Sequence, residues 1–189
     1  MYLEKIECWS HMKKAIFWDL QGTLGGAATE DVTGVELYPF SAEAVKLSMQ
    51  KGYLNIIITN QSKIGKGEIS FADYEKTVKK LMADFAKEDA VIDEFLVCPH
   101  TSKDSCNCKK PKTGLIDLCV EKYMLDISKC CVIGDMGKNE IVMARNAGCK
   151  GILVLTGGGK GSLHEFRDTW AEYEADDIAE NALEAVKLL

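Results

Sequence analysis

The order of apolar and polar segments along the chain predicts an α/β fold, a Rossmann-like three-layer sandwich with a mainly parallel sheet of five or six strands. Short apolar runs alternate with longer helical patterns, and such alternation builds right-handed crossovers that cover both faces of a parallel sheet. The 189 residues, 47% of them hydrophobic, suffice for one domain with one core. The sequence therefore predicts a single domain at residues 13–189. Residues 1–12 are expected to be a leader or extension with no part in the fold.

Five apolar runs are the expected strands, and the segments between them have the spacing of helices. Ser70 is the expected N-cap of the longest helix, with Asp73 in its first turn. Gly52 and Gly148 stand where helix-ending glycines belong. The expected strands are Lys14–Asp19, Leu54–Thr59, Glu94–Cys98, Cys130–Gly134 and Gly151–Leu155, and the expected helices are Ala42–Lys51, Phe71–Lys87, Gly114–Met124, Glu140–Ala147 and Ala179–Leu188.

The lengths of the connections argue against a large cap domain. Residues 20–59 hold only a glycine-rich loop, one helix and one strand, and residues 62–109 hold one helix, one strand and a cysteine-rich loop. Neither stretch has room for an additional domain. We expect an open site, roofed at most by the loop Gly25–Phe40 and by the cysteine-rich loop.

Polar residues suited to phosphate chemistry follow four of the expected strands. The carboxyl ends of parallel strands meet at one edge, where ligands of open α/β sheets bind. Any one of these features has an ordinary explanation, such as a helix cap or a solvated lysine pair, but four in order favour a phosphate site. They are Asp19 with Thr23, the hydroxyl and amide cluster Thr59–Ser62, the cationic run Lys109–Lys112, and the carboxylate-bearing segment Gly134–Glu140.

With these residues the chain resembles the haloacid dehalogenase-like superfamily of phosphohydrolases. The similar branch holds histidinol-phosphatase, D-glycero-D-manno-heptose 1,7-bisphosphate phosphatase and the phosphatase domain of polynucleotide kinase-phosphatase. Thr59–Gly67 looks like the second motif of that branch, and Cys98–Pro111 looks like its zinc loop running into the catalytic lysine. The resemblance covers residues 13 to about 156.

The resemblance implies a role for each polar group. Asp19 would attack phosphorus and form an aspartyl-phosphate. Mg²⁺ would bind the Asp19 carboxylate, the backbone carbonyl of Gln21 and the Asp135 carboxylate. Thr59 and Lys110 would hold the transferring phosphoryl oxygens. Further contacts to substrate are expected from Thr23, Asn60, Gln61 and Lys109.

Three positions depart from the family pattern. Gln21 replaces the aspartate that serves as general acid and base, so hydrolysis should be slower by roughly 10²–10⁴ and Gln21→Asp should raise turnover by roughly 10²-fold. The second aspartate of the metal-binding motif is Asn139, and we expect Glu140, one residue later, to replace it as a Mg²⁺ ligand. Lys109 stands where the branch often has arginine. An arginine can bind a phosphate through two parallel N–H groups, whereas a lysine offers one ammonium charge.

The cysteine-rich loop carries a compact set of soft metal ligands. Three thiols and one imidazole are the natural ligands of tetrahedral Zn²⁺, and four protein ligands leave no open position, so the expected metal is structural. The alternative is a reduced, metal-free loop with coincidental spacing. The expected ligands are Cys98, His100, Cys106 and Cys108.

Composition restricts the partners. The net charge of −6 argues against a nucleic-acid partner bound by bulk electrostatics. No apolar stretch reaches the roughly 20 residues that span a bilayer, and the N-terminal residues lack the pattern of a signal peptide. Of the remaining cysteines, Cys8 lies in the expected leader, whereas Cys119, Cys130, Cys131 and Cys149 fall in apolar segments and fit buried thiols better than disulfides. We expect a cytoplasmic protein without membrane contact, as a monomer or weak dimer.

Three functions fit the sequence. The favoured one is a Mg²⁺-dependent phosphatase of a small phosphorylated metabolite, a sugar bisphosphate of the heptose 1,7-bisphosphate type, with histidinol phosphate as the alternative substrate. The second is a catalytically impaired relative that binds a phosphorylated ligand or a partner protein. The third is a phosphoryl carrier whose aspartyl-phosphate persists because no base activates water.

Overall fold

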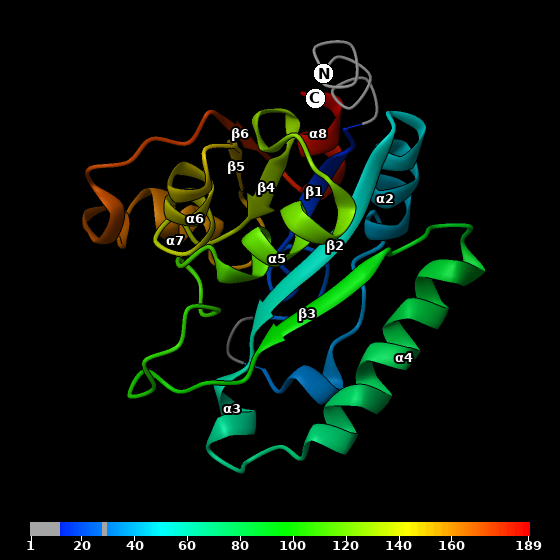
Figure 1. The fold of residues 1–189 in the computed structure, drawn as a ribbon, viewed down its shortest axis with the longest axis vertical. Coiled ribbons are helices and arrows are strands. Elements are labelled where there is room, and N and C mark those ends of the chain that lie inside the picture. Colours follow the sequence, from blue (N-terminus) through cyan, green and yellow to red (C-terminus); the bar gives the residue numbers. More distant parts are fainter. Residues whose placement is uncertain (1–11, 28–29) are drawn as a thin grey trace, which may run out of the picture.

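The computed structural model describes residues 12–27 and 30–189 and contains a six-stranded sheet with helices on both faces (Figure 1). The strand order is β3-β2-β1-β4-β5-β6, and every neighbouring pair is parallel. The predicted α/β sandwich with a parallel sheet is confirmed. The strands are β1 (Lys14–Trp18), β2 (Tyr53–Asn60), β3 (Glu94–Cys98), β4 (Cys131–Gly134), β5 (Lys150–Val154) and β6 (Asp177–Ala179).

The helices form the two outer layers. Their bounds are α2 (Ser41–Gln50), α3 (Ser62–Gly65), α4 (Phe71–Lys87), α5 (Gly114–Tyr123), α6 (Glu140–Ala147), α7 (Gly159–Leu163) and α8 (Ala182–Lys187). Three short 3-10 turns complete the described elements: η1 (Val32–Gly34), η2 (Ile127–Lys129) and η3 (Arg167–Trp170).

Alternate residues of the central strand face opposite layers, as the pleat of a strand requires. Ile16 and Trp18 of β1 join the core formed with α2, α4 and α8, whereas Ala15 and Phe17 join the core formed with α5 and α6. All four side chains are fully buried. The sheet is therefore covered on both faces, which explains why its central strands read as continuous apolar runs.

The local signals for helix ends agree with the structure. The Ser70 hydroxyl accepts a hydrogen bond from the backbone N–H of Asp73 at 3.1 Å, which caps α4. Gly148 ends α6 in the left-handed region with φ of 78°. Gly52 directly follows Lys51, the C-cap residue of α2, and also has positive φ.

The expected C-terminal helix begins too early. We placed its start at Ala179, but Ala179 is the last residue of β6, paired with Val154 of β5, and the helix begins at Ala182. Asn181 accepts a hydrogen bond from the backbone N–H of Glu184 and so caps this helix. The three-residue strand is too short for its pattern to show in the sequence.

The predicted leader falls outside the described residues except for Met12. Lys13 forms an isolated bridge with Leu125, and the sheet starts at the next residue. Within the described residues, no helix combines the length and the apolar character needed to cross a membrane.

Candidate active site

Asp19 directly follows β1, and its backbone N–H still donates to Ile133 of β4 at 2.9 Å. This bond fixes Asp19 at the carboxyl edge between the two strands. The side chain is only slightly accessible, and the Thr23 hydroxyl donates to its Oδ2 at 3.3 Å. A buried carboxylate at this edge is therefore held by both its backbone and its turn.

The ammonium group of Lys110 lies at the centre of the site. It donates to Asp19 Oδ1 at 2.5 Å, to Glu140 Oε1 at 2.8 Å and to the backbone carbonyl of Ile58 at 2.9 Å. Its three N–H groups thus join the ends of β1 and β2 to the start of α6. Burial alone would lower the pKa of Lys110, but the charges of Asp19 and Glu140 outweigh it and raise that pKa. Lys110 is therefore a permanent cation.

Two further carboxylates follow β4, and both are almost fully buried. Burial, reinforced by the charges of Asp19 and Glu140, raises the pKa of Asp135 to about 8. Burial also raises the pKa of Glu140 to about 7, although Lys110 acts in the opposite direction. Asp135 Oδ2 accepts from the Gly158 N–H at 2.7 Å, and Glu140 Oε2 accepts from the Met136 N–H at 3.0 Å.

Three carboxylates therefore share one site with a single ammonium group. Ionised together they would carry excess negative charge in a poorly solvated place, and burial with this repulsion raises the pKa values of Asp135 and Glu140. A hard divalent cation with oxygen ligands, such as Mg²⁺, would offset that charge, so Asp19 and Asp135 fit the metal. Glu140 rather than Asn139 reaches this cluster, and its contact in the structure is the ion pair with Lys110.

Glycines pack closely around Asp135. A Cβ atom at Gly22 would lie 2.1 Å from Asp135 Oδ2, and one at Gly157 would lie 2.4 Å from the same oxygen and 2.4 Å from Gly22 Cα. Thr156 closes the contact, because its hydroxyl donates to the Gly22 carbonyl at 2.6 Å. The loop after β5 and the turn after β1 thus enclose Asp135 between two backbones. Only glycine leaves room for this carboxylate.

The residues at the end of β2 are hydrogen-bonded to other parts of the site. The Asn60 amide accepts from the Lys110 N–H at 3.1 Å and donates to the Lys110 carbonyl at 3.3 Å. The Gln61 amide donates to the Thr59 hydroxyl at 2.8 Å. Within residues 12–27 and 30–189 the Thr59 hydroxyl hydrogen has no acceptor, so it can be donated to a phosphoryl oxygen. Substrate contacts by Asn60 and Gln61 stay a prediction, since both amides have partners within the protein.

The Gln21 side chain is hydrogen-bonded to the surrounding loops. Its amide nitrogen donates to the carbonyls of Ala27 at 3.0 Å and Glu30 at 3.1 Å, and its amide oxygen accepts from Gln61 at 2.8 Å. Both N–H groups and the oxygen are therefore engaged. The backbone carbonyl of Gln21 is the group expected to bind Mg²⁺, whereas its side chain joins Ala27, Glu30 and Gln61.

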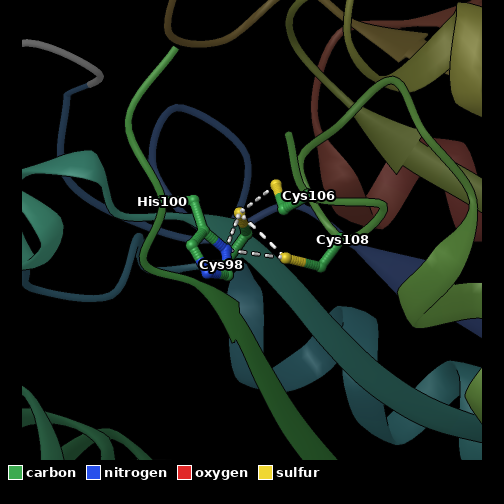
Figure 2. Close-up of side chains that lie close together, drawn as sticks. All are labelled: Cys98, His100, Cys106 and Cys108. Atoms are coloured by element: carbon green, nitrogen blue, oxygen red, sulfur yellow. Dashed lines mark hydrogen bonds between the residues drawn. The ribbon is translucent and has the colours of Figure 1, made fainter. Parts of the chain in front are cut away.

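The four predicted zinc ligands lie together at the end of β3 and in the loop that follows it (Figure 2). Their ligand atoms all lie within 4.8 Å of one another. Sulfur atoms on a tetrahedral Zn²⁺ stand about 3.8 Å apart, and Cys98 Sγ lies 3.8 Å from Cys106 Sγ and 3.2 Å from Cys108 Sγ. His100 Nδ1 lies 3.1 Å from Cys108 Sγ. The donor set fits a closed structural zinc site.

Thiol acidity in the cluster is uneven. Burial raises the pKa of Cys98 to about 12, whereas the backbone N–H of Lys109 and the neighbouring thiols outweigh desolvation and lower the pKa of Cys106 to about 7. Zinc binds thiolates, so it would compensate the burial of Cys98. The Lys109 ammonium donates to the His100 carbonyl at 3.2 Å, and this bond turns it toward the zinc loop.

Comparison with known proteins agrees with this geometry. The chain is 36% identical over 131 residues to a probable D-glycero-D-manno-heptose-1,7-bisphosphate 7-phosphatase of Thermoplasma volcanium. The matched residues make up 68% of this chain and 88% of the relative. The model of the HAD-hydrolase-like family matches residues 107–185. The chain belongs to the haloacid dehalogenase-like phosphohydrolases. As a member of this family it is a phosphoric monoester hydrolase.

This phosphohydrolase is also similar to a second curated relative and to a solved structure. The histidine biosynthesis bifunctional protein HisB of Blochmanniella floridana is 37% identical over 97 residues, which are 51% of this chain but only 27% of HisB. The crystal structure of D,D-heptose 1,7-bisphosphate phosphatase from B. bronchiseptica, complexed with magnesium and phosphate, superposes with a TM-score of 0.81 and 25% identity. That match covers 93% of this chain and 97% of the other.

Sequence reasoning missed the glycine-rich loop of the phosphohydrolase site. Thr156, Gly157 and Gly158 all contact the turn after β1 or the Asp135 carboxylate. A signal was present, because the run 156–161 contains four glycines and follows the fifth strand at the same edge of the sheet. Tyr38 was also missed; its hydroxyl donates to the Gly26 carbonyl at 2.5 Å.

The close approach at Gly157 predicts that Gly157→Ala disturbs the site. The new Cβ would push Asp135 away from Asp19, and we expect phosphatase kcat/KM to fall by roughly 10-fold or more. Gly67→Ala is the matched control, because Gly67 has φ of 73° but nothing within 4 Å of its Cβ position. Equal activity of the two variants, measured on a phosphate ester, would show that Asp135 tolerates the shift.

The raised carboxyl pKa values predict how stability depends on pH. Burial raises the pKa of Asp135 to about 8 and that of Glu140 to about 7 in the folded protein, against ordinary values of 3.8 and 4.5. The folded state thus retains protons that the unfolded state releases. The free energy of unfolding of the metal-free protein therefore falls as the pH rises from about 5 to 8. The slope is about 1.4 kcal/mol per pH unit for each proton retained. Urea unfolding at several pH values measures the slope. Added Mg²⁺ should flatten it, and a flat profile without metal would contradict the assignment.

Proposed function

We propose that this phosphohydrolase is a Mg²⁺-dependent phosphatase of a small phosphorylated metabolite, with a sugar bisphosphate of the heptose 1,7-bisphosphate type as its preferred substrate. The observation that carries the proposal is the Asp19 carboxylate held against the Lys110 ammonium at 2.5 Å, with Asp135 and Glu140 beside them. The relatives named as heptose bisphosphate phosphatases support the substrate class. The proposal places the enzyme in the cytoplasm, where thiols stay reduced.

Asp19 acts as the nucleophile in this proposal. One of its oxygens forms a bond to phosphorus while the bond from phosphorus to the sugar oxygen breaks, and that oxygen leaves with the bonding electrons. Water then attacks the aspartyl-phosphate, which releases inorganic phosphate and restores Asp19. Mg²⁺, when bound by Asp19, Asp135 and the Gln21 carbonyl, would add positive charge at the phosphoryl group.

Lys110 and Thr59 stabilise the transferring phosphoryl group. Lys110 keeps its proton because its pKa is raised, so it offsets the charge of phosphoryl oxygens and takes no part in proton transfer. The Thr59 hydroxyl donates its free hydrogen to another oxygen. Asn60 keeps Lys110 in place by bridging the N–H and carbonyl of its backbone.

The proton for the leaving sugar oxygen has no donor at position 21. The Gln21 amide cannot transfer one, and it is turned toward Ala27 and Glu30. A leaving group that departs without protonation, such as an anomeric sugar oxygen, should suffer least. We therefore expect slow turnover and a strong dependence of rate on the basicity of the leaving group.

Two alternatives each have one supporting observation. A catalytically impaired relative that binds a phosphorylated ligand or partner is favoured by the engagement of the Gln21 side chain. Histidinol-phosphatase is favoured by the match to HisB, of which this chain covers only a small part.

Hydrolysis of a panel of phosphate esters tests the proposal. With Mg²⁺ we expect the highest kcat/KM on heptose 1,7-bisphosphate, lower values on histidinol phosphate and p-nitrophenyl phosphate, and a loss of roughly 10³-fold or more in Asp19→Asn. Phosphorus NMR identifies which phosphate is released. Asp89→Asn, a matched change at an exposed residue, should leave the rates unchanged. Binding without turnover would instead support the impaired relative.

We also propose that Cys98, His100, Cys106 and Cys108 hold one structural Zn²⁺. The loop they form leads directly into Lys109 and Lys110, so the metal would fix the backbone from which the central ammonium group projects. A loop without regular structure has few other means of holding that lysine.

Elemental analysis of protein purified without added metal tests the zinc site. We expect about one zinc per chain, lost when Cys106 and Cys108 are both changed to serine, with activity lowered and the sheet still folded by circular dichroism. Cys130→Ser is the control, because Cys130 is buried just before β4, at the opposite edge of the sheet from Cys98 at the end of β3, and its loss should leave zinc bound. Zinc unaffected by the double change would refute the assignment.

A further inference from the structure

The side chain of Gln21 connects three segments of the active site. It follows β1, it receives a hydrogen bond from Gln61 after β2, and it donates to the carbonyls of Ala27 and Glu30. Gln61 extends the connection to Thr59, whose hydroxyl accepts from the same amide nitrogen. One continuous set of hydrogen bonds therefore runs from Thr59 to the loop after the first strand.

The direction of each hydrogen bond is fixed by the chemistry of its partners. Ala27 and Glu30 present carbonyl oxygens, which only accept, so the nitrogen of Gln21 must face them. Gln61 then faces the Gln21 oxygen and must donate. Exchanging O and N at Gln21 would place an acceptor against two acceptors and a donor against a donor. The observed orientation is the one that satisfies all three contacts.

The two residues that Gln21 holds also contact each other. The Glu30 N–H donates to the Ala27 carbonyl at 3.0 Å, and the Ala27 N–H donates to the Glu30 carboxylate at 3.0 Å. The N–H of the preceding residue, Gly26, donates to the Glu36 carbonyl at 3.1 Å, which ties this part of the loop to the chain before α2. Gln21 therefore binds two residues that are already joined to each other.

We propose that Gln21 is a positioning residue that fastens Ala27 and Glu30, in the loop after β1, to the end of β2, and that a carboxylate cannot replace it. A carboxylate offers no hydrogen to the two carbonyl oxygens, so its charge would face two acceptors. The amide that stands in place of the acid/base aspartate is thus the group that the loop requires. This deepens the proposed function and relies on it only for the kinetic readout.

The proposal revises the expected effect of Gln21→Asp. If position 21 were only a vacant acid/base site, this change would raise turnover. If Gln21 fastens the loop, the aspartate releases Ala27 and Glu30, and its shorter side chain withdraws the oxygen that accepts from Gln61. The gain of a proton donor then comes with a displaced loop, and KM rises.

Hydrogen exchange of the backbone tests the fastening directly, without any substrate. We expect exchange at residues 26, 27 and 30–36 to be faster by roughly 10-fold or more in Gln21→Glu and Gln21→Asp, because two hydrogen bonds are lost. Gln50→Glu makes the same chemical change at the exposed end of α2 and should leave exchange in this segment at the wild-type rate. Wild-type exchange in both position-21 variants would overturn the proposal.

Kinetics on p-nitrophenyl phosphate with Mg²⁺ supply the second readout. We expect KM to rise by roughly 5-fold or more in both variants, whereas Gln50→Glu keeps wild-type values. Higher kcat in Gln21→Asp with unchanged KM and unchanged exchange would overturn the proposal in favour of a vacant acid/base position. Faster exchange in the position-21 variants, together with no hydrolysis of any phosphate ester by the wild type, would support the fastening role and reject the proposed function. Failure of the fastening role and failure of the proposed function are therefore distinguishable.

Discussion

The ion cluster around Lys110 is the interaction on which the rest of the site depends. A buried ammonium group is tolerated only when charged and polar partners replace its water, and Lys110 has three, from Asp19, Glu140 and the Ile58 carbonyl. Removing one partner of such a buried pair typically costs about 3–5 kcal/mol, because the other charge is left without compensation. The cluster therefore joins the ends of β1 and β2 to α6 and keeps Asp19, the proposed nucleophile, beside a permanent cation.

The position of the cluster follows from the sheet. β1 lies between β2 and β4, so the chain moves to one side of β1 for β2 and β3 and to the other side for β4, β5 and β6 (Figure 1). Ligands of open α/β sheets bind where this direction reverses. Asp19 leaves the sheet at that point, while Lys110 arrives from the loop after β3 and Asp135 follows β4. Parallel pairing alone brings residues distant in sequence to one edge.

The sequence could predict the groups whose position depends on this topology, and it could not predict those that depend on loop packing. Asp19, Lys110 and Asp135 follow apolar strands, so the parallel sheet brings them together. Glu140 could be inferred by counting back from the end of α6 at Gly148. The orientation of the Gln21 amide depends on two backbone carbonyls, and backbone groups have no signature in the sequence. The three-residue β6 was too short for a visible pattern.

The absence of room for a large cap gives the Gln21 network its physical reason. A site at an open sheet edge must fix its surrounding loops with its own side chains, and an amide does this better than a carboxylate because it donates and accepts at once. In the proposed mechanism the same amide cannot move a proton, so the network that orders the loop would also limit the leaving groups that the enzyme releases. Loop order and leaving-group range would then both depend on one side chain, and a change at position 21 would alter both together.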